Sequence, residues 1–301
     1  MKLIHRIYFG FDGKPDPYLR FLETWQKELP DFEIVHWNAD NLPLDLNEYT
    51  RRMYVLKNHA FLSDYFRWWI LNEYGGVYLD ADIEVINGAK FSEIVNSVQE
   101  NPDLDGFIGI DNKDGGWYTA HSMGAKKGSF FSSEMLRIYD SLGPFVPWMD
   151  RNVYLFAPCL VGLFFANNNH NVGAMGSTSH LDVPRDVIGV RIYPQEYFSP
   201  ITPVVRDGVG AFIVNGLSAH TCLCHHFSGS WHDSNSIYAK VLNEKKKNGQ
   251  LLLKEVLENG LLEQSNEAIE SPTIMRVMRL LRRRIPQAVQ EFKQTIARKE
   301  S

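Results

Sequence analysis

The chain has 301 residues, of which 44% are hydrophobic, 13% aromatic and 22% charged, and its formal net charge is −5. This composition excludes a disordered or collagen-like chain, and the acidic balance argues against a nucleic-acid binder. Three cysteines are too few for a disulfide framework, and charge and proline interrupt the N-terminus before a signal-peptide core forms. The longest apolar run, residues 155–166, falls short of the roughly 20 residues that span a bilayer. We therefore expect a soluble, cytoplasmic chain.

Strands and helices alternate along the first part of the chain. The first predicted strand covers residues 3–10, a helix follows at 18–29, and a second strand covers 32–37. A strand–helix–strand start favours an α/β sheet with parallel neighbours. The next helix is predicted at 59–74, between an Asn58 N-cap and a Gly75-Gly76 stop, and it leads into a strand at 77–86.

Later elements continue this pattern. Further strands are predicted at 105–110, 117–125, 187–194 and 217–227, and further helices at 132–141 and 157–167. Residues 1–235 are expected to form one domain, followed by a helical extension at 236–301. Within it, residues 271–301 carry eight Lys and Arg against two Glu, with apolar residues at helical spacing. Such a basic amphipathic helix can contact an anionic membrane surface or pack its apolar stripe on the body.

Two aspartates stand two residues apart in the strand predicted at 77–86. Because alternate residues of a strand share a face, Asp80 and Asp82 are expected to project together. Their carboxylates repel each other unless a cation lies between them or both reach water. Hard divalent ions such as Mg²⁺ or Mn²⁺ prefer carboxylate oxygens. The pair therefore indicates either a metal site or a solvated strand end.

Asp64 and Arg67 are three residues apart on the helix predicted at 59–74, so they share one helical face. The helix is otherwise largely apolar, which places the pair in a buried setting where charges need partners. A phosphate or a sugar hydroxyl is one such partner. A surface ion pair that contributes little is the plainer alternative.

These motifs together resemble one family. Ser63-Asp64-x-x-Arg67, followed by the run GGVYLDAD at 75–82, looks like the DXD-containing sugar-binding region of glycosyltransferase family 32. The opening run from Ile4 to Gly10 also resembles the first strand of that family. The match is specific over residues 3–86 and looser over 105–235. The resemblance implies an α/β fold of the GT-A type, with a Rossmann-like, mostly parallel mixed sheet flanked by helices; the C-terminal helical appendage lies outside it.

The resemblance also assigns roles to residues. Asp82 would bind a divalent cation directly and Asp80 would contact the ribose or the metal shell. Asp64 and Arg67 would hold the donor sugar and its phosphates, and these four residues form the expected catalytic set. Further donor contacts are expected from five residues, the first two of which would line a uracil pocket: Tyr8, Phe9, Gly10, Gly76 and Tyr78. Enzymes of this family are expected to retain the anomeric configuration of the donor sugar.

Histidines and cysteines cluster at residues 220–226. The cluster suggests zinc, but its spacing lacks a second cysteine pair, so a strand is the better interpretation. In a strand, four of these side chains share one face: His220, Cys222, Cys224 and His226. The run HHFSGSW at 225–231 resembles the C-terminal motif of family 32 and the His-x-x-Gly motif of family 8, in which a histidine completes the metal shell.

That second resemblance completes the predicted site. It makes His226 the ligand beside the two aspartates, with His225 as the alternative. It also places Ser230 and Trp231 on the donor diphosphate. An imidazole ligand favours Mn²⁺ over harder ions, with Mg²⁺ as the other expected cofactor.

The expected function is that of a retaining, metal-dependent glycosyltransferase. It would move a sugar from a nucleotide sugar, UDP-linked in our expectation, to a glycan or lipid-linked acceptor in bacterial capsule or lipopolysaccharide synthesis. Contact of residues 271–301 with lipid would make it peripheral on the inner face of the plasma membrane. A toxin-like protein glycosyltransferase and a non-catalytic sugar-nucleotide-binding module are the alternatives.

Several features are left open by the sequence. A carboxylate on the opposite face of the sugar is not assigned, although Asp111, Asp114 and Glu134 lie in a suitable region. Residues 111–129 either shape the acceptor site or form an ordinary loop and strand. The donor sugar, the choice between UDP and GDP, the acceptor and linkage, and the oligomeric state are not fixed.

Overall fold

The computed structural model describes residues 2–111, 117–143, 157–168, 181–206, 209–214, 216–228 and 251–258. These residues belong to the first of two compact units, Met1–Glu263 and Gln264–Ser301. The basic helix predicted at 271–301 lies outside the described residues. Within the first unit, Arg20 binds helix α9 (Leu253–Glu258). Its guanidinium donates to both carboxylate oxygens of Glu255 at 2.6 and 2.7 Å. The domain boundary at residue 235 stays a prediction.

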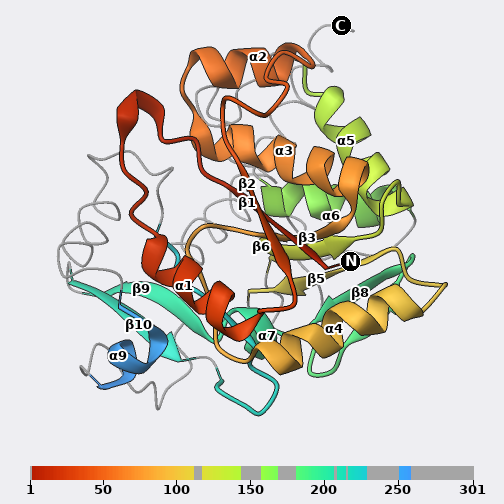
Figure 1. The fold of residues 1–301 in the computed structure, drawn as a ribbon. Coiled ribbons are helices and arrows are strands. Elements are labelled where there is room, and N and C mark those ends of the chain that lie inside the picture. Colours follow the sequence, from red (N-terminus) through yellow and green to blue (C-terminus); the bar gives the residue numbers. More distant parts are fainter. Residues whose placement is uncertain are drawn as a thin grey trace, which may run out of the picture. The chain divides into compact units, whose positions relative to one another are not determined.

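A seven-stranded sheet lies at the centre of the described fold (Figure 1). Its strands are, in spatial order, β2 (Glu33–Trp37), β1 (Leu3–Ile7), β3 (Gly76–Leu79), β6 (Tyr118–Ala125), β5 (Gly106–Ile110), β8 (Val190–Tyr193) and β7 (Arg185–Val187). β1 is parallel to β2 and β3, and β5 is parallel to β8. β6 runs antiparallel to β3 and β5, and β7 to β8. The predicted α/β fold with a mixed sheet and one prevailing strand direction is therefore confirmed.

Helices gather on both faces of this sheet because alternate strand residues are apolar on each face. One side holds α2 (Glu48–Val55), α3 (His59–Tyr74), α5 (Phe130–Asp140) and α6 (Ala157–Asn167), and the other holds α1 (Leu19–Glu28), α4 (Gly88–Glu100) and the short α7 (Gln195–Phe198) (Figure 1). In β3, Tyr78 belongs to the core under α3, whereas Val77 and Leu79 belong to the core under α4.

Two small antiparallel pairs complete the described strands. β9 (Ile201–Arg206) pairs with β10 (Val209–Val214). β4 (Ile83–Val85) pairs with β11 (Leu223–His225), so that Cys224 lies opposite Glu84. This second pairing matters for function, because it brings the histidine segment beside the residues that precede β4.

Helix α3 begins and ends where the sequence predicts. The Asn58 side chain accepts the Phe61 backbone N–H as N-cap, and Gly75 ends the helix with φ of 67°. A Cβ on Gly76 would lie 2.8 Å from the Leu3 carbonyl of β1, so this position admits only glycine. Gly76 therefore serves strand packing at the start of β3, three residues before that strand ends. Its predicted donor contact stays a prediction.

The strand predicted at 77–86 is two strands joined by a turn. Asp80, Ala81 and Asp82 leave the sheet between β3 and β4, and the Ile83 N–H closes the turn on the Asp80 carbonyl at 3.1 Å. The expectation that the two aspartates share a strand face was wrong. The turn, rather than strand periodicity, directs their side chains.

Other boundaries also shifted. The strand predicted at 187–194 is the β7–β8 hairpin, which turns at Ile188 and Gly189 with φ of 50° and 73°. The strand predicted at 217–227 is confined to β11, and helices α2, α4 and α7 were not predicted. None of the described helices combines the length and apolar character needed to cross a bilayer.

Candidate active site

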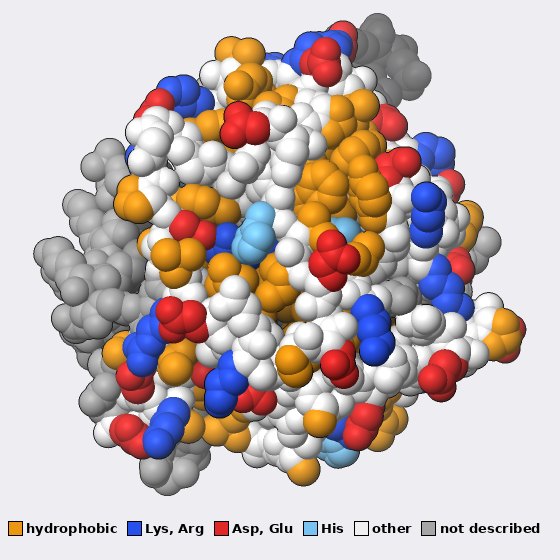
Figure 2. All heavy atoms as spheres, viewed as in Figure 1, with side chains coloured by type: hydrophobic (Ala, Val, Ile, Leu, Met, Phe, Trp, Pro, Cys, Tyr) orange, Lys and Arg blue, Asp and Glu red, His pale blue; other side chains and the backbone are white. Residues whose placement is uncertain are grey.

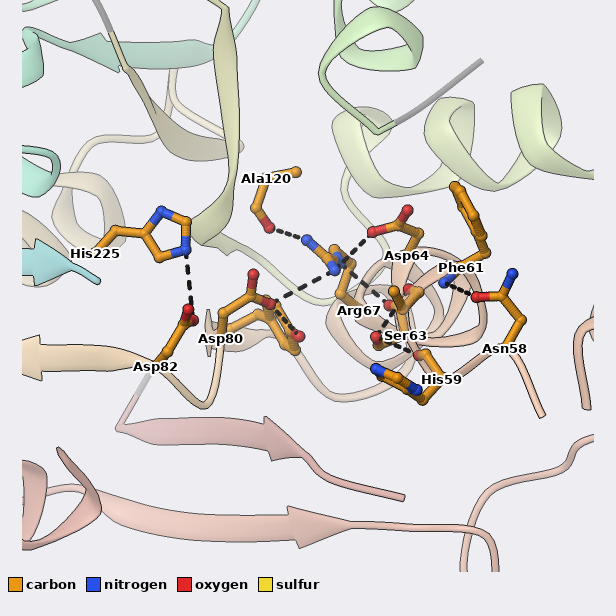
Figure 3. Close-up of polar contacts among 12 residues, drawn as sticks. Asn58, His59, Phe61, Ser63, Asp64, Arg67, Asp80, Asp82, Ala120 and His225 are labelled. Carbon is orange, nitrogen blue, oxygen red and sulfur yellow. Dashed lines mark hydrogen bonds and ion pairs between the residues drawn. The ribbon is translucent and has the colours of Figure 1, made fainter. Parts of the chain in front are cut away.

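Polar side chains from three parts of the chain converge at the turn between β3 and β4. Asp80 and Asp82 come from the turn itself, Asp64 and Arg67 come from α3, and His225 comes from β11 (Figure 3). Figure 3 shows Arg67 between Asp64 and Asp80, with His225 approaching Asp82 from the other side. The predicted association of the α3 pair with the aspartate pair is thus present in the structure.

Arg67 is the centre of the first half of the site. Its side chain is only 5% exposed, and its terminal nitrogen lies 2.7 Å from Asp64 and 3.5 Å from Asp80. The guanidinium also donates to the carbonyls of Ser63 and Ala120. Burial opposes the charge of Arg67, but the carboxylates raise its pKa above that of an ordinary arginine. Arg67 is therefore a fixed cation beside the DXD turn.

Tyr78 and Asp64 complete the surroundings of this cation. The Tyr78 ring lies 4.8 Å below the guanidinium, and its hydroxyl donates to Asp80 at 2.6 Å. Tyr78 is buried, so its side chain orients Asp80 and Arg67 from beneath. Burial raises the pKa of Asp64 to about 6, against the opposing effect of Arg67.

We expect Arg67→Lys to destabilise the protein by about 2–4 kcal/mol, because lysine cannot reproduce the forked contacts and leaves buried oxygens without donors. The change is measured as the free energy of unfolding in urea. Arg137→Lys is the matched control, since Arg137 makes a similar i,i+3 pair with Glu134 on an exposed helix face. Equal stabilities of the two variants would contradict this role of Arg67.

Asp82 is the centre of the second half. One carboxylate oxygen lies 3.4 Å from His225 Nε2, and the other accepts the Ser228 backbone N–H at 2.8 Å and the Ser228 hydroxyl. Burial works against ionisation of Asp82, but His225 and Ser228 hold its pKa well below the usual range. Asp82 therefore stays ionised at neutral pH.

The histidine beside the aspartates is His225, not His226. His226 lies on Glu84, with 2.8 Å between Nε2 and the carboxylate, and its ring stacks on Phe21 at 4.5 Å. Successive residues leave an extended segment on opposite sides, so only one of the two can face Asp82. The geometry therefore does not place His226 beside the aspartates as predicted. His225, the alternative named from the sequence, lies there, and its role as a metal ligand stays a prediction.

The donor set fits a divalent ion. The ligand atoms of Asp80, Asp82 and His225 all lie within 4.8 Å of one another. Among the described residues, His225 Nδ1 is buried without a hydrogen-bond partner, whereas its Nε2 lies 3.4 Å from Asp82. Two carboxylates and an imidazole suit Mn²⁺, and Mg²⁺ is compatible with the oxygens.

A second group of possible ligands, Glu84, Cys224 and His226, is equally close together. Its carboxylate already accepts hydrogen bonds from His226 and from the Leu253 backbone at 2.8 and 2.7 Å. Burial raises the pKa of the Cys224 thiol well above its usual value. We interpret this group as a hydrogen-bonded link between β4, β11 and α9.

Sequence reasoning did not connect His225 with the residues that hold it. The His121 ring of β6 stacks on it at 4.1 Å, and the Phe227 ring contacts it at 4.0 Å. Both nitrogens of His121 meet serine hydroxyls, Ser122 at 2.8 Å and Ser199 at 3.0 Å, and burial lowers its pKa well below the ordinary value. Phe227 has φ of 46°, a strained backbone conformation for a bulky residue. This conformation directs the chain so that Ser228 reaches Asp82.

The sequence also did not assign a site role to Tyr18, which lies between two predicted site residues, Tyr8 and Asp82. Burial and the nearby charge of Asp82 raise its pKa to about 12, and its hydroxyl interacts with Ser228. Its ring meets the Tyr8 ring edge-on at 6.4 Å. The local sequence gave no signal of this role, because Tyr18 reaches the site only through packing of the loop after β1.

The other predicted donor residues are placed differently. The Tyr8 hydroxyl donates to the Pro15 carbonyl at 2.7 Å, so Tyr8 borders the loop after β1. Phe9 is buried and stacks on Phe11 at 5.2 Å, and Gly10 turns the chain with φ of 55°. Phe9 is therefore a packing residue in this structure. Ser230 and Trp231 lie outside the described residues, as does Asp114.

The sequence left three carboxylates as possible functional acids, and the structure describes two of them, Asp111 and Glu134. Asp111 has the surroundings expected of a functional acid. It accepts the Trp117 N–H at 2.8 Å, and burial raises its pKa to about 7, opposed by that hydrogen bond and by His225. Glu134 is instead paired with Arg137 on α5. Asp111 thus lies near the histidine side of the site.

This raised pKa predicts a pH effect on stability. Between its unfolded pKa of 3.8 and its folded pKa of about 7, the folded protein holds a proton at Asp111 that the unfolded chain has released. Its contribution to stability is therefore present at low pH and lost as the pH rises through about 7. The unfolding free energies of wild type and of Asp111→Asn are measured in the presence of a chelator. The wild-type value minus the variant value should fall by about 1–3 kcal/mol from about pH 5 to pH 8. A difference that rises with pH would contradict the assignment.

Comparison with known proteins agrees with this geometry. Residues 15–101 match the family described as "Glycosyltransferase sugar-binding region containing DXD motif". The matched segment includes α3 with Asp64 and Arg67 and the turn with Asp80 and Asp82. The predicted resemblance to the family 32 sugar-binding region is confirmed, and this chain is a glycosyltransferase.

Two solved structures are similar to the chain at low identity. "PaToxG Glycosyltransferase" is 14% identical over 56% of this chain and 69% of its own, with a TM-score of 0.43. A glycosyltransferase "involved in the glycosylation of the major capsid of PBCV-1" is 13% identical over 81% of this chain and 98% of its own, with a TM-score of 0.40. No curated protein matches the sequence.

Proposed function

We propose that this protein is a retaining, divalent-metal-dependent glycosyltransferase of the GT-A type that uses a nucleotide sugar, UDP-linked in our proposal. The observation that carries the proposal is the convergence of Asp80, Asp82 and His225 beside the buried cation Arg67. Carboxylates together with a fixed cation suit a diphosphate that must be bound through a metal and stabilised as it departs.

Each side chain has a distinct task in this proposal. Asp82 is kept ionised, and Asp80 is oriented by the Tyr78 hydroxyl, so both can ligate a cation with His225. When bound, that cation supplies Lewis-acid stabilisation of the leaving diphosphate. Arg67 adds a second positive charge that is already fixed before the reaction and requires no reorganisation. Asp64, beside it, is suited to accept hydrogen bonds from hydroxyls of the donor sugar.

Retention of configuration is part of the proposal and requires no covalent intermediate. The acceptor hydroxyl would attack from the same face that the diphosphate leaves. Asp111, whose pKa is raised to about 7, is available near His225 to accept the proton that the acceptor hydroxyl loses as it bonds to the sugar. The acceptor would be a glycan or a lipid-linked glycan of bacterial surface polysaccharide synthesis, such as capsule or lipopolysaccharide.

The deciding experiment is a panel of UDP- and GDP-sugars tested for slow hydrolysis with Mn²⁺, with Mg²⁺ and with chelator. We expect one donor to be hydrolysed with metal only, and nuclear magnetic resonance of the released sugar to show the original anomer first. A protein that neither hydrolyses nor binds any nucleotide sugar in the presence of Mn²⁺ would overturn the proposal.

A further inference from the structure

One buried histidine of β6 contacts residues from both halves of the active site. Among the described side chains on the face shown in Figure 2, acidic and basic groups are interspersed, so surface charge there singles out no further ligand. The interior is more informative. His121 is 6% exposed, and it contacts both the turn that carries Asp80 and the strand that carries His225.

The backbone of β6 holds the first half of the site. The His121 carbonyl accepts the Asp80 N–H at 2.8 Å. The neighbouring Ala120 carbonyl accepts a hydrogen bond from the Arg67 guanidinium (Figure 3). β6 is the fourth of seven strands, and the strands at the centre of a sheet are the last to open. These two carbonyls therefore fix the turn and the cation relative to the sheet.

The side chain of His121 holds the second half. Its ring stacks on the His225 ring, with 4.1 Å between centroids and 28° between planes. His225 Nε2 lies 3.4 Å from Asp82, whereas its Nδ1 has no hydrogen-bond partner among the described residues. A hydrogen bond at the second ring nitrogen is the usual way in which a protein orients a metal-binding imidazole. At His225, packing against the His121 ring supplies that orientation instead.

The His121 ring is itself fixed by two serines. Its Nδ1 lies 2.8 Å from the Ser122 hydroxyl and its Nε2 lies 3.0 Å from the Ser199 hydroxyl, and both serines are fully buried. Since each nitrogen already has a hydrogen-bond partner, neither is left to bind a metal or to exchange a proton with a substrate. The network therefore suits His121 to orient a neighbour rather than to react.

We propose that His121 is a positioning residue for metal binding, whose carbonyl holds Asp80 and whose ring holds His225 so that both face one cation. The inference rests on the proposed function, because it takes Asp80, Asp82 and His225 as the ligands of a divalent ion. Phe227 also contacts the His225 ring, at 4.0 Å, but it belongs to the same segment and moves with it. His121 instead belongs to the central sheet.

The test compares His121→Ala with His5→Ala in the full chain. His5 is a matched control, since it is a strand histidine that is 1% exposed and whose nitrogens meet the Trp37 indole at 3.1 Å and the Gly75 carbonyl at 2.8 Å. Both variants should lose stability in urea with chelator, because each leaves buried polar groups without a partner. Only His121→Ala should weaken Mn²⁺ binding in calorimetry, by about tenfold.

A double-mutant cycle separates positioning from a general structural effect. If His121 acts through His225, its loss should change little in the His225→Ala background, and the double variant should bind Mn²⁺ about as weakly as His225→Ala alone. A purely structural effect would weaken binding equally in both backgrounds. Ser199→Ala replaces His121→Ala if that variant does not fold. It keeps the stacked ring, removes one hydrogen bond that orients it, and should weaken Mn²⁺ binding by a smaller factor.

Two results would overturn the inference. One is a Mn²⁺ affinity of His121→Ala, or of Ser199→Ala in its place, that equals that of His5→Ala. The other is an equal loss of affinity from the substitution in the wild-type and His225→Ala backgrounds. Wild type is tested in parallel with Mn²⁺ and the nucleotide sugars. If it binds none of them, the proposed function fails; if it binds them and the His121 variant binds Mn²⁺ equally well, only the inference about His121 fails.

Discussion

Substitution of Asp82 by asparagine is expected to reduce metal-dependent turnover by a factor on the order of 10²–10³ or more. The wild-type carboxylate is ionised throughout the working range because its pKa is held well below the usual value. An amide is neutral and a much poorer ligand for a hard cation. It still offers an oxygen to the Ser228 N–H, so the turn should keep its conformation.

The measurement combines donor hydrolysis with Mn²⁺ titration by calorimetry, and thermal unfolding without metal confirms that the variant is folded. Asp186→Asn is the control, since Asp186 is an exposed aspartate paired with Arg191 at 2.6 Å. Turnover and Mn²⁺ affinity of Asp82→Asn that match this control would exclude a metal role for Asp82.

The second large effect is expected from substitutions at the adjacent residues His225 and His226, which have different partners. His225→Ala is expected to weaken Mn²⁺ binding by about 10–100-fold, because the imidazole nearest the aspartates is removed. His226→Ala is expected to leave Mn²⁺ affinity unchanged and to cost about 1–3 kcal/mol of unfolding free energy, because buried Glu84 loses a hydrogen-bond donor.

The two variants are each other's control, since they differ by one position in the same segment. Calorimetry gives the metal affinity, and urea unfolding in chelator gives the stability. If His226→Ala lost metal affinity while His225→Ala kept it, the assignment first made from the sequence would stand and the geometric one would fall.

The sequence was sufficient for the elements whose signals are local. The helix predicted at about 59–74 was found there because an Asn58 cap and a Gly75 stop mark its ends. The strand–helix–strand start followed from hydrophobic periodicity and was found as β1, α1 and β2 with a parallel register. Asp64, Arg67, Asp80 and Asp82 were identified as one group from their motif, and the structure brings them together.

The sequence was insufficient where position depends on contacts between distant segments. Strand periodicity placed Asp80 and Asp82 on one strand face, but the chain turns there because β4 leaves the main sheet to pair with β11. Tyr18, which shares Ser228 with Asp82, gave no local signal, because it reaches the site only through packing of the loop after β1.

The amino-acid sequence by itself determined the class of enzyme and the identity of its acidic and cationic residues, because residue type and spacing express the chemistry of a motif. The tertiary structure decided which histidine joins them, because adjacent residues point in opposite directions. Only the register between β4 and β11 selects the one that faces Asp82.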